Sequence, residues 1–271
     1  MPRSTNFEDY QHVPRPLAVM ARTYPAGFRG VAHRHPRAQF LHAISGVMRA
    51  KAANTIFVIP PDRGLWIPPG TTHVVHTRGI VEMRTIYLAR EAIAALPGSC
   101  CVMITTPLLR QLILAALEEP VEYDEEGRGG LIFGLMLDEL SRLPRTPLGV
   151  PMPSGKRLKS ACELLLADPA SPLGLEELAR EAGASSRTLA REFAAETGLS
   201  FTAWRNRLRL SEASAQLAEG SSVAEVARRC GYGSPSAFTA MMRRTLGAAP
   251  RDIGRVAARP HYGPDFTRIK L

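Results

Sequence analysis

The segment SVAEVARRCGYGSPSAFTAMMRRTLGAAP (residues 222–250) has the pattern of two short helices joined by a glycine turn. Ser222 and Glu225 stand three residues apart, which is the spacing of a capping box at the start of a helix. Gly231 follows where the first helix must end, and glycine adopts the positive φ that such a turn favours. Ser234, with a proline after it, suits the N-cap of the second helix. The stretch therefore predicts a helix-turn-helix unit.

The segment GLEELAREAGASSRTLAREFAAETGLS (residues 174–200) repeats this pattern. Its apolar positions, small alanine and turn glycine match at a nearly constant offset, which indicates that one supersecondary unit occurs twice. Between the units, residues 201–220 predict a helix that spans about 27 Å at roughly 1.5 Å per residue. That length approaches the ~34 Å between successive major grooves on one face of DNA. The first matched positions are Leu175, Leu178, Ala179, Arg180 and Gly183 with Val223, Val226, Ala227, Arg228 and Gly231.

Polar and basic side chains occupy the face of each second helix that the core residues leave free. A helix-turn-helix lays its second helix in the major groove, and arginine suits phosphates and guanine edges. The chain has 34 basic and 25 acidic residues, and its net charge of +9 fits a polyanionic partner or merely solubility. For any single arginine, a solvated helix face is the alternative. The candidate DNA contacts are Ser185, Arg187, Arg191, Ser236, Thr239 and Arg243.

Residues 156–255 closely resemble the DNA-binding domain of AraC/XylS transcription regulators, through the Gly-Tyr turn, the Ser-Pro-Ser-Ala-Phe helix start and GASSRTLAREFAAETGLSF. The resemblance implies an all-α domain with two helix-turn-helix motifs that binds promoter DNA. RNA polymerase is a further candidate partner. Met242 stands where that family usually has an aromatic residue. Methionine fills the same core space more loosely, so we expect the fold to be kept.

The first half of the chain has a different pattern. Up to about residue 90, short apolar runs are broken by proline and glycine, which predicts β-strands. LLRQLILAAL and GGLIFGLMLDELSRL, within residues 105–143, have the apolar spacing of helices. PRTPLGVPMPSG (residues 144–155) has the composition of a linker.

The stretch GFRGVAHRHPRAQFLHAISG (residues 27–46) contains three of the candidate metal ligands. His33 and His35 alternate on a strand and should share one face. Gln39 could join them after a turn, and His73 follows a Pro-Pro-Gly turn further on. Three imidazoles and an amide oxygen would suit one divalent transition metal: zinc, nickel, copper or iron.

The spacings G-x5-H-x-H-x3-Q-x6-G and P-P-G-x2-H resemble the two cupin motifs, with glutamine in place of the usual glutamate. The resemblance implies an antiparallel β-barrel in which His33, His35, Gln39 and His73 face the interior. Gly64 and Thr77 depart from the second motif.

Three interpretations of the histidines remain open: scaffold residues or contacts to an organic effector, a metal site that controls DNA affinity, or a cupin enzyme centre. His42 lies three residues past Gln39, and His76 lies three residues past His73. Odd spacing on a strand places both on the face opposite the candidate ligands, so we expect them at the outer surface.

Cysteine spacing, targeting signals and hydropathy exclude several classes of protein. No Cys-x-x-Cys pair supports a zinc ribbon, no signal peptide is recognised, and no apolar run approaches the ~20 residues of a membrane span. We therefore expect a cytoplasmic protein without a membrane partner. The resemblance to cupin-bearing members of the regulator family implies a homodimer, and the helices within 105–143 could form its contact.

The sequence predicts a two-domain α+β protein: a cupin-like, effector-sensing and dimerisation domain (residues 1–143) with trailing helices, a linker (144–155), an AraC-type DNA-binding domain (156–255) and a tail (256–271) without an assigned role. The expected function is that of a non-enzymatic, sequence-specific transcription regulator, an activator or a repressor. A metal ion or small molecule in the barrel would modulate its binding to double-stranded promoter DNA. The alternative is a metal-dependent cupin enzyme fused to a DNA-binding domain.

Overall fold

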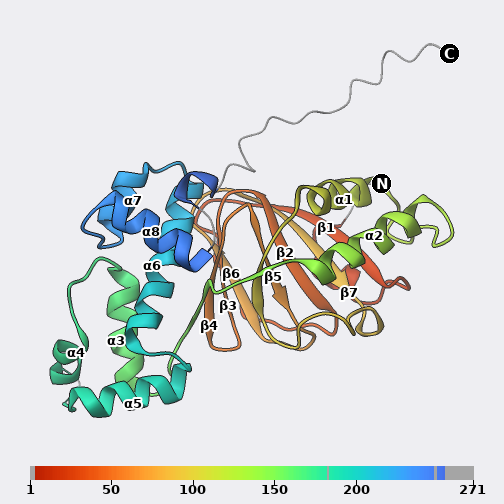
Figure 1. The fold of residues 1–271 in the computed structure, drawn as a ribbon. Helices are drawn as coiled ribbons and strands as arrows, with labels where there is room; N and C mark the ends of the chain where they lie inside the picture. Colours follow the sequence, from red (N-terminus) through yellow and green to blue (C-terminus); the bar gives the residue numbers. More distant parts are fainter. Residues whose placement is uncertain (1–3, 182, 247–248, 254–271) are drawn as a thin grey trace.

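A computed structural model describes residues 4–181, 183–246 and 249–253 of the chain. In that part, a β domain with two trailing helices precedes an all-helical domain (Figure 1), which confirms the predicted two-domain α+β architecture. Short 3-10 turns occur at Phe7–Tyr10, Arg90–Ala92 and Pro250–Asp252. The strands are β1 (Leu17–Tyr24), β2 (Ala38–Ser45), β3 (Met48–Ala52), β4 (Thr55–Ile59), β5 (Arg63–Ile67), β6 (His73–Thr77), β7 (Val81–Leu88), β8 (Cys101–Ile104), β9 (Arg145–Thr146) and β10 (Gly149–Pro151).

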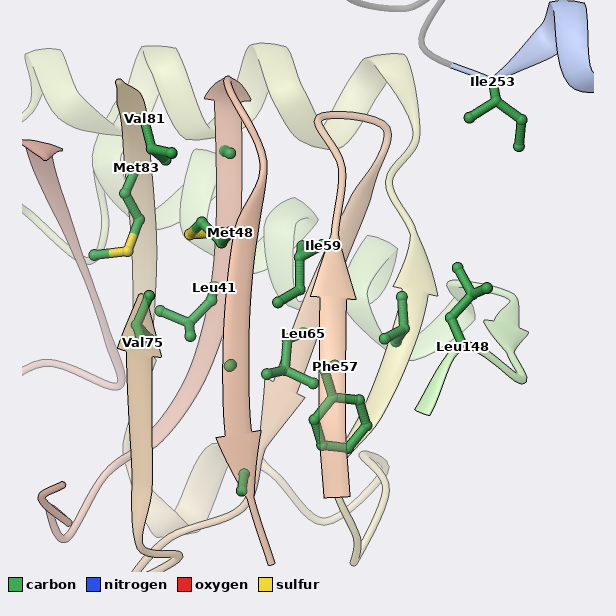
Figure 2. Packing of buried hydrophobic residues seen from close by; sticks show 14 of the residues in the cluster. Leu41, Met48, Phe57, Ile59, Leu65, Val75, Val81, Met83, Leu148 and Ile253 are labelled. Carbon is green, nitrogen blue, oxygen red and sulfur yellow. The ribbon is translucent and has the colours of Figure 1, made fainter. Parts of the chain in front are cut away.

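The strands form two sheets, in the orders β1-β7-β2-β5-β8-β9 and β10-β4-β3-β6, and all the recorded pairings are antiparallel. Residues of strands β1 to β8 that point between the sheets form one apolar core. Figure 2 shows this core, with Leu41, Leu65 and Met83 from one sheet and Met48 and Val75 from the other.

The outer face of the six-stranded sheet is covered by α1 (Pro107–Glu118) and α2 (Arg128–Arg142). Thr106 caps α1 by accepting a hydrogen bond from the backbone of Leu109. Both helices bury one apolar face against outward residues of the sheet, such as Phe40 and Trp66. The helices predicted within residues 105–143 are thus confirmed, and they make a second layer on the β domain.

The helical domain contains two helix-turn-helix units, as predicted. Gly183 and Gly231 have φ of 62° and 73° after the first helix of each unit, so both turns need glycine as expected. The side chains of Ser222 and Ser234 cap the helices that follow them. The helices are α3 (Lys156–Ala167), α4 (Leu175–Glu181), α5 (Ser186–Thr197), α6 (Phe201–Ala218), α7 (Val223–Arg229) and α8 (Pro235–Leu246).

Helix α6 connects the apolar cores of the two units, and the core of the second unit is continuous with that of the β domain. Phe193 and Trp204 belong to the first core, whereas Phe238 and Met242 are fully buried beside α6 in the second. Met242 therefore fills the core position expected of it. The last residues assigned to the DNA-binding domain, 254–255, and the tail, 256–271, lie outside the described residues.

The segment predicted to be a linker differs from the expectation. Strand β9 pairs with β8, and β10 pairs with β4, so the segment completes an edge of each sheet. Val150 and Met152 are buried, but they pack in the core of the first helix-turn-helix unit. Residues 145–152 thus join the two domains as shared structure.

Helix α6 lies against the four-stranded sheet (Figure 1). Its Ser211 hydroxyl donates to the Leu148 carbonyl at 2.8 Å, and Ala215 packs on Val47 and Val58. Because the same helix joins both helix-turn-helix units, the β domain holds the centre of the helical domain.

Candidate functional sites

Three histidines meet at one end of the β domain. His33 lies in an irregular segment rather than in the strand that the sequence predicted, but it exchanges two backbone hydrogen bonds with His73, at 2.9 and 3.0 Å. This pairing places the two side chains next to each other on one face. One ring nitrogen of each of His33, His35 and His73 lies within 4.8 Å of the others. The structure therefore brings together the three predicted imidazoles.

Backbone carbonyls fix which nitrogen of each of the three rings donates a hydrogen bond. The Nδ1 atoms of His33, His35 and His73 lie 2.9, 2.8 and 2.9 Å from the carbonyl oxygens of Val31, Arg37 and Thr71. A carbonyl only accepts, so each Nδ1 donates a proton, and in the neutral form of each ring the lone pair is on Nε2. Metal-binding histidines are oriented by this same second hydrogen bond.

The Nε2 of His73 is buried and has no hydrogen-bond partner among the described residues, and only 2% of the residue is exposed. An unpaired buried acceptor is costly, so this atom marks a position where a ligand would be favourable. Burial lowers the pKa of His73 to about 4 and also lowers the pKa of His35. Both rings are thus neutral near pH 7, as a metal ligand must be.

Gln39 completes the predicted set. Its Oε1 lies 3.1 Å from the Nε2 of His35, where two acceptors would face each other if Nδ1 of His35 is protonated. Either the side-chain amide is rotated so that its NH2 donates to the His35 nitrogen, or a cation binds both acceptor atoms. The four residues thus converge, and their donor set suits a borderline divalent metal.

A cavity of about 250 Å³ adjoins the histidines. His33, Gln39 and His73 form part of its wall, and the remainder is mainly apolar and aromatic. Burial raises the pKa of Tyr87, so this lining phenol remains neutral. Sequence reasoning missed the following lining residues, most of which belong to the core between the sheets: Phe7, Met20, Arg22, Tyr24, Phe28, Leu41, Val75, Met83 and Tyr87.

The N-terminal segment covers this end of the domain. The ring of Phe7 lies 4.7 Å from that of His33, and Tyr10 stacks on Tyr87 at 5.8 Å. The buried guanidinium of Arg37 donates to the carbonyls of Gln11, Val13 and Arg15, which ties the segment down. The cavity wall therefore includes residues far apart in the sequence.

His42 is not the surface residue that the sequence predicted. It points away from the cavity, as its spacing required, but α1 and α2 cover that face of the sheet and only 1% of it is exposed. Its Nδ1 donates to the Arg63 carbonyl at 3.1 Å, and burial lowers its pKa to about 4. His76 is half-buried on the four-stranded sheet, opposite Arg49.

The candidate DNA contacts lie on α5 and α8. Arg187, Arg191 and Arg243 are exposed, and no ion pair engages them within the described residues. Ser236 is exposed and Thr239 is half-buried on the same side of α8 as the arginine. Exposed cationic side chains on the second helix of each unit suit contacts with phosphates and base edges.

Ser185 has a different local role. Its hydroxyl caps α5 by accepting from the Thr188 backbone N–H at 3.1 Å, and it also bonds to the Thr188 hydroxyl at 2.9 Å. The serine is exposed at the N-terminus of the helix, so any contact with DNA would be made by a side chain that also holds the cap. Arg244 is a second exposed arginine near the end of α8, which the sequence analysis did not include.

Two family models match the chain. One, described as an AraC-like ligand binding domain, matches residues 19–201, and the other, a helix-turn-helix domain, matches residues 178–255. Together they span residues 19–255, which include the three histidines and both of the helices that carry the candidate DNA contacts.

Curated relatives are transcriptional regulators. The chain is 31% identical over 227 residues to the HTH-type transcriptional regulator NimR of Escherichia coli, a match that covers 84% of this chain and 82% of NimR. It is 37% identical over 100 residues to the HTH-type transcriptional regulator RipA of Corynebacterium glutamicum, covering 37% of this chain and 30% of RipA. Among solved structures, an AraC-type transcriptional regulator from Chromobacterium violaceum is 27% identical with a TM-score of 0.36, covering 39% of this chain and 95% of that one.

Proposed function

This chain belongs to the AraC family of DNA-binding transcription regulators with an N-terminal ligand-binding domain, and on that premise we propose that a divalent metal ion held by His33, His35 and His73 modulates its binding to promoter DNA. The observation that carries the proposal is the buried, unpaired Nε2 of His73. It lies beside two further imidazoles whose Nδ1 atoms are fixed by backbone carbonyls. Gln39 is the fourth candidate ligand, and zinc, nickel, copper and iron(II) are the metals to test.

The three histidines would act by joining separate segments. His33 and His35 lie in the irregular segment before β2, whereas His73 begins β6. A metal supplies a positive charge and fixed bonds when bound, so the histidines would lock this segment against the sheet. Phe7 rests on His33, so the N-terminal segment would be ordered by the same event. Binding energy that differs between two arrangements is what shifts their populations.

A short route leads from the pocket to the DNA-binding domain. Strand β6 carries His73 and pairs with β3, and Arg49 on β3 forms an ion pair with Glu212 of α6. Helix α6 in turn joins the two helix-turn-helix units. We propose that a change in the β6–β3 edge alters the position of α6 and thereby the fit of α5 and α8 to adjacent major grooves.

The proposed DNA contacts are Arg187 and Arg191 on α5 and Ser236, Thr239 and Arg243 on α8, with Ser185 at the start of α5. The arginines would bind base edges or phosphates, and the hydroxyls would do either. RNA polymerase is the proposed second partner, and the cytoplasm the proposed location. Within the described residues, no helix has the length and apolar character that crossing a membrane requires.

We also propose a homodimer in which α2 forms the contact. Leu131 and Leu135 are 76% and 44% exposed, stand four residues apart on one face of α2, and flank Gly134, whose missing side chain leaves that face open. Leu108 of α1 is a further exposed leucine, at 45%. Exposed leucines on one helix face are typical of an interface, and a dimer would let four helix-turn-helix units read a repeated operator.

Fluorescence anisotropy tests the metal proposal. The full-length protein is titrated onto a labelled fragment from upstream of its own gene, at fixed salt, in EDTA and then with each metal. We expect one metal to shift the affinity at least tenfold, and His33→Ala and His73→Ala to abolish the shift. His12→Ala is the matched control, because His12 is exposed and outside the cluster.

A fragment that binds tightly with the same affinity under all conditions would contradict metal control and leave an organic effector. A metal shift that persists in His73→Ala would place the metal elsewhere. Turnover of a small molecule by the metal-loaded protein would favour a cupin enzyme. Among the described residues, the cavity lining has no carboxylate to serve as a base, which supports the sensor instead.

A further inference from the structure

The charges around the cavity are unbalanced. Its wall contains two histidines and a neutral amide, and no aspartate or glutamate is among the described lining residues. A divalent ion on the three imidazoles would keep its full double charge in a half-buried site. Buried charge is costly unless an opposite charge compensates it. The acidic group that acts on His35 is Glu8, which lies outside the cavity lining, so a molecule that enters the cavity would supply negative charge directly at the metal.

The coordination geometry leaves room for such a molecule. Three histidine nitrogens within 4.8 Å of one another supply three positions. Zinc sites with three protein ligands keep a further position open for an exogenous group. Gln39, the fourth candidate ligand, is a neutral amide in contact with His35, so it supplies no charge even where it coordinates the metal. An anionic oxygen is the natural group to complete the site.

The remainder of the cavity favours a ligand whose main part is apolar. Met20, Tyr24, Leu41, Val75, Met83 and Tyr87 line it from four strands. A volume of about 250 Å³ corresponds to roughly eight water molecules at their share of liquid volume, which fits a small monocyclic or short-chain molecule. Most of the ligand would be desolvated against these side chains.

Arg22 marks a basic approach to the cavity. It lies on β1 between Met20 and Tyr24, contributes to the cavity wall, and has its guanidinium 4.8 Å from the Tyr24 ring. The same arginine, with Arg84, also lines an open depression on the adjoining surface. Glu82 pairs with Arg84 at 3.8 Å, and Arg22 has no recorded acidic partner among the described residues. This side of the cavity therefore attracts anions.

We propose that the effector of this protein is a small organic anion of the carboxylate class, whose oxygen completes the coordination of the metal on His33, His35 and His73 and whose apolar body fills the cavity. The inference rests on the proposed metal site and specifies the second ligand of that site. Arg22 favours entry of the anion, and Phe7 and Phe28 contact its body near the mouth.

Absorption spectroscopy of the cobalt(II)-loaded, full-length protein tests the inference. A visible spectrum that disappears in His73→Ala first establishes the metal site. Azide, a small anion that needs no apolar fit, is then added, followed by 3-phenylpropanoate and its neutral isostere 3-phenylpropanamide. We expect azide and the carboxylate to shift the spectrum, and the amide to leave it unchanged.

Calorimetry supplies the second readout. We expect 3-phenylpropanoate to bind the zinc-loaded protein at least tenfold more tightly than the EDTA-treated protein. Arg22→Leu should weaken that binding several-fold. Arg78→Leu is the matched control and should have no effect, because Arg78 is exposed and does not line the cavity.

The outcomes separate the two proposals. A cobalt spectrum that depends on His73 but responds to neither azide nor the carboxylate overturns the anion inference and leaves the metal site intact. Equal binding of the amide and the acid overturns it as well. If cobalt does not bind the histidines, the metal site fails and the inference fails with it, even if the carboxylate binds the metal-free protein.

Discussion

Arg49 on β3 and Glu212 on α6 form a bidentate ion pair, with nitrogen–oxygen distances of 2.5 and 2.6 Å. The glutamate side chain is 7% exposed and the arginine side chain 21%, so the pair is largely removed from water. It joins a strand of the β domain to the helix between the two helix-turn-helix units. No sequence motif indicated this contact, because the residues are distant in the chain and each looks like an ordinary surface charge.

We expect Glu212→Ala to lower the free energy of unfolding by about 3 kcal/mol, because it leaves the Arg49 guanidinium buried without its partner. Urea denaturation of the full-length protein measures the change. The double variant Arg49→Met with Glu212→Met should lose much less stability than Glu212→Ala, since it removes both charges and keeps the volume. Equal losses in the two variants would show that packing, and not an unpaired charge, sets the cost.

Buried His42 should make the protein sensitive to mild acid. Its pKa is lowered from 6.5 to about 4 by burial, so the unfolded chain takes up a proton first as the pH falls. Stability is then complete above pH ~6.5 and is lost as the pH falls toward ~4, by up to ~3 kcal/mol at ~1.4 kcal/mol per pKa unit.

His42→Leu tests this assignment through urea denaturation at several values between pH 7 and pH 4. We expect lower stability at pH 7, since the hydrogen bond to Arg63 is lost, but a shallower decline toward acid. The metal-free protein is used, so that competition between metal and protons at His73 does not contribute. An unchanged slope would assign the acid sensitivity to other groups.

The exposed arginines of α5 and α8 should carry specific DNA binding. Arg191→Ala and Arg243→Ala are each expected to weaken operator affinity by ~1–3 kcal/mol, with a smaller effect on unrelated DNA if the contact is to a base. Anisotropy at several salt concentrations measures both affinities. Arg78→Ala in the β domain is the control, and an unchanged operator affinity would remove the tested arginine from the interface.

Two charges on the exposed face of α2 should prevent dimerisation. Leu131→Glu with Leu135→Glu replaces both exposed leucines, and their exposure means that the monomer fold should tolerate the change. Light scattering after size exclusion measures the mass, and circular dichroism checks the fold. A wild-type protein that is monomeric at all concentrations, or a double variant that is still dimeric, would contradict the proposed interface.

Local sequence signals were sufficient to predict the helices and turns of the helical domain. Turn glycines, serine caps and a repeated apolar pattern act within a few residues, and the structure has both units where they indicated. The convergence of His33, His35, Gln39 and His73 was also predicted, from strand alternation and turns and from the resemblance to the cupin motifs.

Contacts between segments distant in the sequence could not be predicted from such local signals. The alternation of side chains along a strand correctly predicted that His42 points away from the cavity. Alternation does not reveal that two later helices cover the outer face of the sheet. The composition of residues 144–155 suggested a linker because proline and glycine interrupt central strands. Proline is also tolerated on an edge strand, and Pro151 lies on the edge strand β10.

Strand β10 also limits how the two domains of this protein can be exchanged with those of other regulators. Its ladder belongs to the β domain, but Val150 is in the core of the first helix-turn-helix unit, and the Trp204 indole donates to the Pro151 carbonyl at 2.6 Å. A chimera cut at the end of the proline-rich segment would leave the transplanted helices with an open core and an unpaired indole N–H. The two halves are therefore not interchangeable cassettes: a new sensor must bring its own equivalent of β10, matched to the helices that it is to control.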